Sequence, residues 1–179
     1  LNMQRSELSE KNVFYDQYSN DIDKVKETIE EVVKSMRASL EIEKNDLSNV
    51  KLMWVNYPNM PTGRVATKEL FEKLVAFGKK HGIIIVNDNP YSFILNNNPL
   101  SILSVEGAKD ICIELNSMSK SHNMPGWRVG MLASNAQFVS WILKVKSNID
   151  SGTFRSMQLA ASEALMLGEE WYEEINNIY

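Results

Sequence analysis

Short apolar runs that alternate with segments of helical periodicity constrain the fold of this chain more than any other feature. The runs are KLMWVNY (51–57), GIIIVND (82–88), DICIELN (110–116) and WRVGMLAS (127–134). An apolar run without polar alternation is typical of a strand whose two faces are both covered. Strands that alternate with helices predict an α/β fold, with a mostly parallel sheet and helices on both faces.

The helical segments have recognisable starts and ends. Apolar residues recur at helical spacing from Asp21 to about Glu41, after an irregular polar arm over residues 1–20. Thr67 is expected to cap a second helix that ends near Gly82. Three further helices are expected at about 137–148, 156–167 and 169–179.

Composition excludes several classes of function. The net charge is -4 and no long basic stretch is present, which argues against a nucleic-acid surface. No apolar run approaches the ~18 residues of a membrane span, and residues 1–12 lack the apolar stretch of a signal peptide. His81 and His122 have no second ligand at metal spacing, so no metal site is expected.

The single cysteine bears on the compartment. Cys112 cannot form an internal disulfide, which favours a reducing, cytoplasmic location. It lies in the apolar run ICIEL, so a buried, unreactive side chain is expected. Trp54, Trp127, Trp141 and Trp171 are interpreted as core or interface residues.

Three polar segments follow strands of the expected sheet: Asn56–Gly63, Asp88–Tyr91 and Ser117–Lys120. In open α/β sheets, ligands bind beyond the carboxyl ends of the strands. We therefore expect these segments to form one rim that carries the functional site.

The segment SMSKSHNMPGWRVG (117–130) gives the strongest indication of a functional site. Hydroxyls of Ser117 and Ser119, together with the Arg128 guanidinium, could bind a phosphate dianion. A lysine beside such a site, Lys120, can form an imine with an aldehyde cofactor, although a lone lysine at a strand end is more often a solvated surface residue. Glycines at 126 and 130 would allow the backbone to approach closely.

The spacing SxSKxxxxPGxRxG resembles the lysine signature of the class I/II aminotransferases that depend on pyridoxal 5′-phosphate (PLP), of the aspartate aminotransferase-like fold type I. The resemblance implies that Lys120 holds PLP as a Schiff base. It also implies that Ser117, Ser119 and Arg128 bind the phosphate of the cofactor.

The segment DNPY (88–91) extends the resemblance. An aspartate at a strand end is often only a turn former. In the resembled family, the residue matching Asp88 pairs with the protonated pyridine nitrogen of PLP, and a carboxylate there keeps that proton in place. The residue matching Tyr91 donates a hydrogen bond to the phenolic oxygen of the ring.

The turn NYPNMPTG (56–63) resembles the NPTG turn of the family with one departure. Met60 stands where an asparagine normally donates to the phenolic oxygen, and a thioether cannot donate. Asn59 is the nearest replacement, one residue too early. The expected consequence is a raised Schiff-base pKa with PLP binding retained.

The resemblance covers residues 48–179, interpreted as part of a PLP-binding large domain whose small domain is absent, after an arm and helix over residues 1–47. In the family, the four strands are neighbours and the last is antiparallel. The implied function is transamination between an amino acid and a 2-oxo acid, by a homodimer, or a fragment of such an enzyme. Two alternatives remain open, namely a catalytically incompetent PLP-binding remnant or interaction module and a PLP-dependent lyase.

Overall fold

The structure of this chain is a computed structural model that describes residues 42–178. The chain divides between Asn49 and Val50 into two units. The described part of the first unit contains the 3-10 helix η1 (Ile42–Lys44). The predicted arm and the predicted helix from Asp21 to Glu41 lie outside the described residues. All that follows concerns the second unit.

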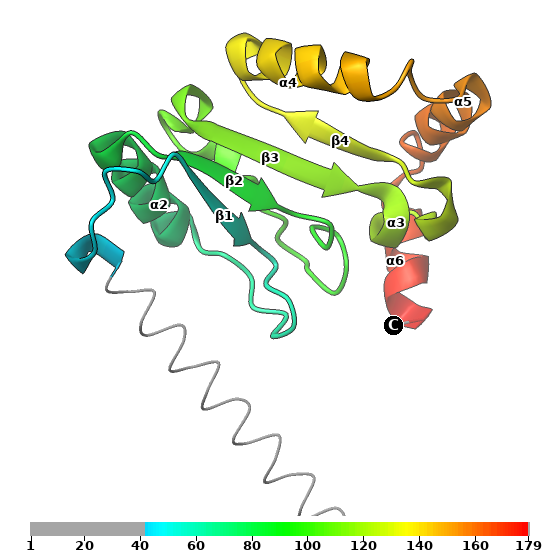
Figure 1. Cartoon of the computed structure of the whole chain (residues 1–179). Coiled ribbons are helices and arrows are strands. Elements are labelled where there is room, and N and C mark those ends of the chain that lie inside the picture. Colours follow the sequence, from blue (N-terminus) through cyan, green and yellow to red (C-terminus); the bar gives the residue numbers. More distant parts are fainter. Residues whose placement is uncertain (1–41, 179) are drawn as a thin grey trace, which may run out of the picture. The chain divides into compact units, whose positions relative to one another are not determined.

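A four-stranded sheet forms the centre of the second unit (Figure 1). It has the spatial order β1-β2-β3-β4 and comprises β1 (Leu52–Asn56), β2 (Ile84–Asp88), β3 (Cys112–Ser117) and β4 (Gly130–Ala133). The first three strands are parallel, and β4 pairs antiparallel with β3. The predicted α/β class, the neighbouring positions of the four strands and the antiparallel last strand are therefore confirmed.

Helices connect and follow the strands. They are α2 (Lys68–His81), α3 (Met118–Ser121), α4 (Ala136–Ile149), α5 (Arg155–Ala164) and α6 (Glu169–Ile178), with 3-10 turns η2 (Ile102–Ser104), η3 (Ala108–Asp110) and η4 (Pro125–Trp127). The predicted caps of α2 are confirmed. The Thr67 hydroxyl accepts the Leu70 N–H at 3.2 Å, and Gly82 ends the helix at φ 65°.

Two sequence predictions need correction at their boundaries. The strand predicted over 127–134 begins only at Gly130, because residues 125–127 form η4 and Arg128 takes a left-handed φ of 54° that interrupts extended backbone. The helix predicted to reach residue 167 ends at Ala164, where the chain turns toward α6.

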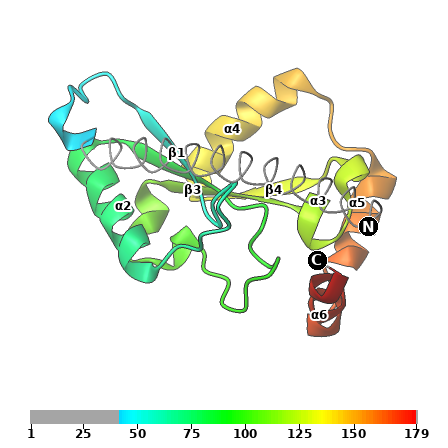
Figure 2. The same ribbon diagram turned by 90° about the horizontal axis from the view of Figure 1, so that it is seen from below.

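Helices α2 and α4 cover opposite faces of the sheet (Figure 2). On the α2 face, Phe71 and Val75 are buried together with Ile85 and Cys112 of the strands. On the other face, Phe138 of α4 packs with Val86 and Ile113, and four partly buried residues surround them: Ile84, Leu115, Leu132 and Ile142. Alternate residues of β2 therefore enter different layers.

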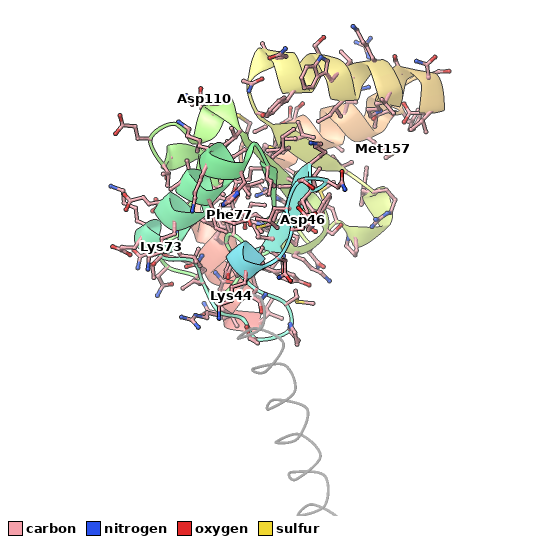
Figure 3. All side chains as sticks on the ribbon, turned by 60° about the vertical axis from the view of Figure 1, so that its left-hand side comes forward. Lys44, Asp46, Lys73, Phe77, Asp110 and Met157 are labelled. Carbon is pink, nitrogen blue, oxygen red and sulfur yellow. The ribbon has the colours of Figure 1, made fainter. Side chains whose placement is uncertain are left out.

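The outer side of α2 is polar. Lys73 is exposed, and Lys79 forms an ion pair of 3.0 Å with Asp110 at the end of η3; Figure 3 labels Lys73, Phe77 and Asp110 in this region. This exposed pair contributes at most about 1 kcal/mol. The buried apolar side chains, not the surface charges, hold α2 to the sheet.

Cys112 is fully buried, as predicted. Burial, and to a smaller extent the nearby negative charge of Glu114, raises the pKa of the Cys112 thiol to about 11. Trp54, Trp127 and Trp141 are 57%, 45% and 50% exposed, so they do not lie in the core, and their place at an interface stays a prediction. Trp171 is partly buried. Within residues 42–178, no helix combines the length and apolar character needed to cross a membrane.

Candidate functional site

The carboxyl ends of β1, β2 and β3 meet at one edge of the sheet (Figure 1). Asn56 is in register with Asp88, and Asp88 is in register with Leu115. The turn after β1, the DNPY segment after β2 and α3 after β3 consequently leave the sheet at the same edge. The predicted position of the three segments at one edge is confirmed, and their role as a functional site stays a prediction.

Lys120 lies in α3, a single helical turn where the sequence indicated a polar loop. The Ser117 hydroxyl accepts the Ser119 N–H at 3.1 Å and so caps this turn. The Lys120 side chain is partly buried, and its Nζ atom lies 5.9 Å from the centroid of the Tyr91 ring. The structure thus brings the predicted amine and the predicted phenol together.

Asp88 is the last residue of β2 and is partly buried. Its main-chain carbonyl accepts the side-chain amide N–H of Asn56 at 2.6 Å, which fixes the end of β2 to β1. By the alternation of a strand, its carboxylate leaves the sheet on the face of Val86, the face that α4 covers.

Arg128 is exposed and its Nη1 donates to the Pro125 carbonyl of its own loop at 2.9 Å. In the described structure, therefore, the guanidinium bonds with η4 and not with the hydroxyls of Ser117 or Ser119. A phosphate bound at those hydroxyls would have to draw the side chain from Pro125. A phosphate dianion makes that exchange favourable, because its negative charge attracts the guanidinium more strongly than a neutral carbonyl does.

Asn59 holds together the turn that carries it. Its Oδ1 accepts the Thr62 hydroxyl at 2.8 Å, and its main-chain carbonyl accepts the Gly63 N–H at 2.7 Å. Gly63 has φ 69°, which favours glycine. Met60 donates its main-chain N–H to Asn56 Oδ1 at 2.7 Å, while its side chain is 56% exposed. The Asn59 amide would therefore give up a bond within the turn in order to reach a cofactor.

A buried polar network beneath the rim was missed in the sequence. Glu114 is 7% exposed, and its Oε1 accepts the amide N–H groups of Asn87 at 3.2 Å and Asn89 at 2.8 Å. Its Oε2 accepts the Ser101 hydroxyl. Asn87 Oδ1 in turn accepts the Tyr57 N–H at 3.2 Å. One carboxylate therefore connects the residues that follow β1 and β2.

A signal for this network does exist in the sequence. A charged residue inside the apolar run ICIEL and an amide inside IIIVND are costly to bury unless they are paired. Their common position near the carboxyl ends of neighbouring strands would have predicted the contact. Asn89 Oδ1 is the one buried side-chain polar atom in the described residues that has no hydrogen-bond partner.

The donor set fits PLP. Lys120 offers an amine beside the Tyr91 ring, and Asp88 offers a carboxylate that could hold a protonated ring nitrogen. Ser117 and Ser119 offer hydroxyls at the same edge. The set combines groups for an aldehyde, a pyridine nitrogen, a phenolic oxygen and a phosphate.

Comparison with known proteins agrees with this chemistry. Residues 3–177 match the sequence model of the family described as aminotransferase class I and II. The LL-diaminopimelate aminotransferase of Nitratidesulfovibrio vulgaris is 46% identical over 132 residues, which are 72% of this chain and 34% of that protein. Its counterpart in Aquifex aeolicus is 47% identical over 131 residues, again 72% and 34% of the two chains.

Solved structures give the same result. BacF from Bacillus subtilis superposes with a TM-score of 0.73 at 37% identity, over 77% of this chain and 36% of that chain. A probable N-succinyldiaminopimelate aminotransferase from Thermus thermophilus has a TM-score of 0.69 at 32% identity, over 72% and 35% of the two chains. The chain spans about a third of the length of the relatives that it matches.

Proposed function

We propose, because the chain belongs to the class I and II aminotransferases, that its rim binds PLP with Lys120 as the covalent attachment point. Enzymes of this family use that cofactor. The observation that carries the proposal is the 5.9 Å approach of Lys120 Nζ to the Tyr91 ring, at the sheet edge where β2 ends in Asp88.

Each residue of the rim has a separate task in this proposal. Asp88 holds the proton on the pyridine nitrogen, and Tyr91 donates to the phenolic oxygen. Ser117, Ser119 and Arg128 bind the phosphate, and Asn59 donates to the phenolic oxygen in place of the asparagine that Met60 replaces. When bound, PLP supplies an electron sink for negative charge at the substrate α-carbon. Lys120 Nζ would bond covalently to the aldehyde carbon. As a free amine, it would move the proton of the substrate α-carbon.

Transamination between an amino acid and a 2-oxo acid is the activity that we propose for the protein. The relatives from Nitratidesulfovibrio vulgaris and Aquifex aeolicus are named LL-diaminopimelate aminotransferases. We therefore propose a diamino dicarboxylic acid of that type as the first amino donor to test. A 2-oxo acid is the acceptor.

The half reaction tests this directly. The chain is loaded with PLP and mixed with LL-diaminopimelate, and the cofactor is then analysed by mass spectrometry. Transfer of the amino group converts PLP to pyridoxamine phosphate and yields the 2-oxo acid. Lys120→Ala should abolish the conversion, whereas Lys109→Ala, at an exposed lysine of η3, should not. Bound PLP without conversion would overturn transamination for this chain, and release of ammonia would indicate a lyase.

We also propose that the protein is cytoplasmic and assembles as a homodimer. The thiol of Cys112 is free and buried, which suits a reducing compartment. Trp141, Val145 and Ile149 expose apolar side chains along α4, at 50%, 61% and 77%. Exposed apolar groups on one helix favour association. Sedimentation equilibrium should give twice the chain mass, and a monomer at all concentrations would contradict the homodimer.

A further inference from the structure

Helix α6 contacts the segment that carries the proposed attachment lysine. The Trp171 indole donates its Nε1–H to the main-chain carbonyl of Ser121 at 2.9 Å. Ser121 directly follows Lys120 and is the last residue of α3. The hydrogen bond therefore anchors the carboxyl end of the helical turn in which Lys120 lies. Figure 1 and Figure 2 show α6 beside α3.

The same helix contacts the segment that carries Tyr91. Asn176 Nδ2 donates to the Phe93 carbonyl at 3.0 Å, and Asn176 Oδ1 accepts the Leu95 N–H at 2.9 Å. Both functions of this amide are used on one short loop. Leu95 has a left-handed φ of 46°, so this loop adopts a conformation that its own sequence does not favour. The two bonds stabilise that conformation from outside.

Tyr172 lies between the two segments and contacts a ring from each. Its own ring stacks on Phe93 with centroids 4.9 Å apart and meets the edge of His122 at 5.7 Å. The Tyr172 hydroxyl is 3.4 Å from His122 Nε2, and the Ser121 hydroxyl is 2.8 Å from His122 Nδ1. His122 and Ser121 are both buried. The aromatic contacts of Tyr172 thus connect the same two segments that the hydrogen bonds of Trp171 and Asn176 connect.

We propose that α6 is a positioning clamp, in which Trp171, Tyr172 and Asn176 set the distance between Lys120 and Tyr91. None of the three touches the proposed cofactor groups in the structure; they act through the residues that follow Lys120 and Tyr91. The consequence for PLP rests on the proposed function. The clamp itself is a property of the chain and can be tested without cofactor.

Matched variants separate the clamp from general packing. Asn176→Ala removes both bonds to the 93–95 loop, and Asn177→Ala, at the exposed next residue of α6, is its control. Trp171→Phe keeps an aromatic ring and removes the donor to Ser121. Trp54→Phe, at a half-exposed tryptophan of β1, is the control for that change.

Amide hydrogen exchange of the full chain without PLP is the first measurement. Asn176→Ala should speed exchange of Leu95, and also of residues 118–124, which it does not touch. Trp171→Phe should speed exchange in residues 118–124, which Trp171 contacts, and also in residues 91–95, which it does not contact. The control variants should leave both segments at wild-type rates. Loss of protection confined to the segment that each variant touches directly would overturn the clamp, because packing alone predicts a local effect.

PLP affinity is the second measurement. Asn176→Ala and Trp171→Phe should each raise the dissociation constant by about three- to tenfold, as expected for one or two lost hydrogen bonds. In a Tyr91→Phe background the effect of Asn176→Ala should shrink, because the group that it positions is gone. Wild-type affinity in both clamp variants would overturn the proposal. If the wild-type chain holds no PLP, the proposed function fails, and the exchange experiment alone decides the clamp.

Discussion

Lys120 Nζ and the ring of Tyr91 lie 5.9 Å apart although they belong to segments that follow different strands. Parallel pairing of β2 with β3 places the two segments at one edge, and the Asn89 N–H bonds to the Leu115 carbonyl at 2.9 Å immediately beyond β2. A cation this close to an aromatic ring gains about 0.5–1 kcal/mol at partly exposed sites. The pairing of the two strands therefore brings Lys120 and Tyr91 together, and the two residues form the centre of the proposed site.

Gly130 allows β4 to approach the end of β3. A Cβ atom at this residue would lie 2.7 Å from the Asn116 carbonyl oxygen, whereas one at Gly126 would meet no atom within 4 Å. Gly130→Ala should lower the free energy of unfolding by about 1–3 kcal/mol. Gly126→Ala introduces no such clash and should change the free energy of unfolding by less than about 0.5 kcal/mol. Urea denaturation of both variants measures the difference, and equal effects would contradict the close approach.

Glu114 should be replaceable by glutamine but not by leucine. In Glu114→Gln, the amide oxygen can still accept from Asn87 and Asn89 while its N–H donates to the Ser101 hydroxyl. Leucine leaves these buried groups unpaired, at about 1–3 kcal/mol for each donor that water cannot reach. We expect Glu114→Leu to cost about 3 kcal/mol or more and Glu114→Gln about 1 kcal/mol in chemical denaturation. Equal losses would show that the network does not stabilise the rim.

His122 should make the chain less stable in mild acid. Burial lowers its pKa below 6.5, and the Ala164 carbonyl only partly offsets this. The unfolded chain therefore binds a proton more readily than the folded chain as the pH falls below about 6.5. Stability should be fully present above that pH and fall by up to about 1.4 kcal/mol per pH unit below it.

Denaturation of wild type and His122→Gln between pH 7.5 and 5.5 measures this effect. The variant has no titrating ring at this position, so its stability should depend less on pH over that range. A wild-type profile that matches the variant's profile would exclude His122 as the cause.

Met60 should tune the bound cofactor. Met60→Asn supplies an amide donor where the thioether has none, and a donor near the phenolic oxygen favours loss of the imine proton. In the PLP-loaded chain, the midpoint at which the visible band changes with pH should therefore fall. Met131→Asn, at a similarly exposed methionine of β4, should leave the midpoint unchanged. An unchanged midpoint in Met60→Asn would show that residue 60 does not reach the phenolic oxygen.

Local patterns were sufficient for the strands, the helices and the shared edge, whereas the neighbouring positions of all four strands and the antiparallel last strand were implied by the family resemblance. The β-branched run at 83–86 predicts a covered strand, and the Thr67 and Gly82 caps follow from side-chain and backbone chemistry close in sequence. The left-handed turn at Arg128 could not be predicted in this way, since no glycine or asparagine stands there. Contacts of α6 were also beyond prediction, because Trp171 and Ser121 are brought together only by tertiary packing.

Borohydride reduction of the PLP-treated chain, followed by peptide mass mapping, tests the central claim most directly. The Lys120 amine and the aldehyde form an imine with loss of water, and hydride addition then fixes the cofactor to the peptide. We expect one pyridoxyl group on the peptide containing Lys120, and none on that peptide in Lys120→Arg. Labelling spread over exposed lysines such as Lys144 and Lys146, in equal yield for wild type and Lys120→Arg, would contradict the account.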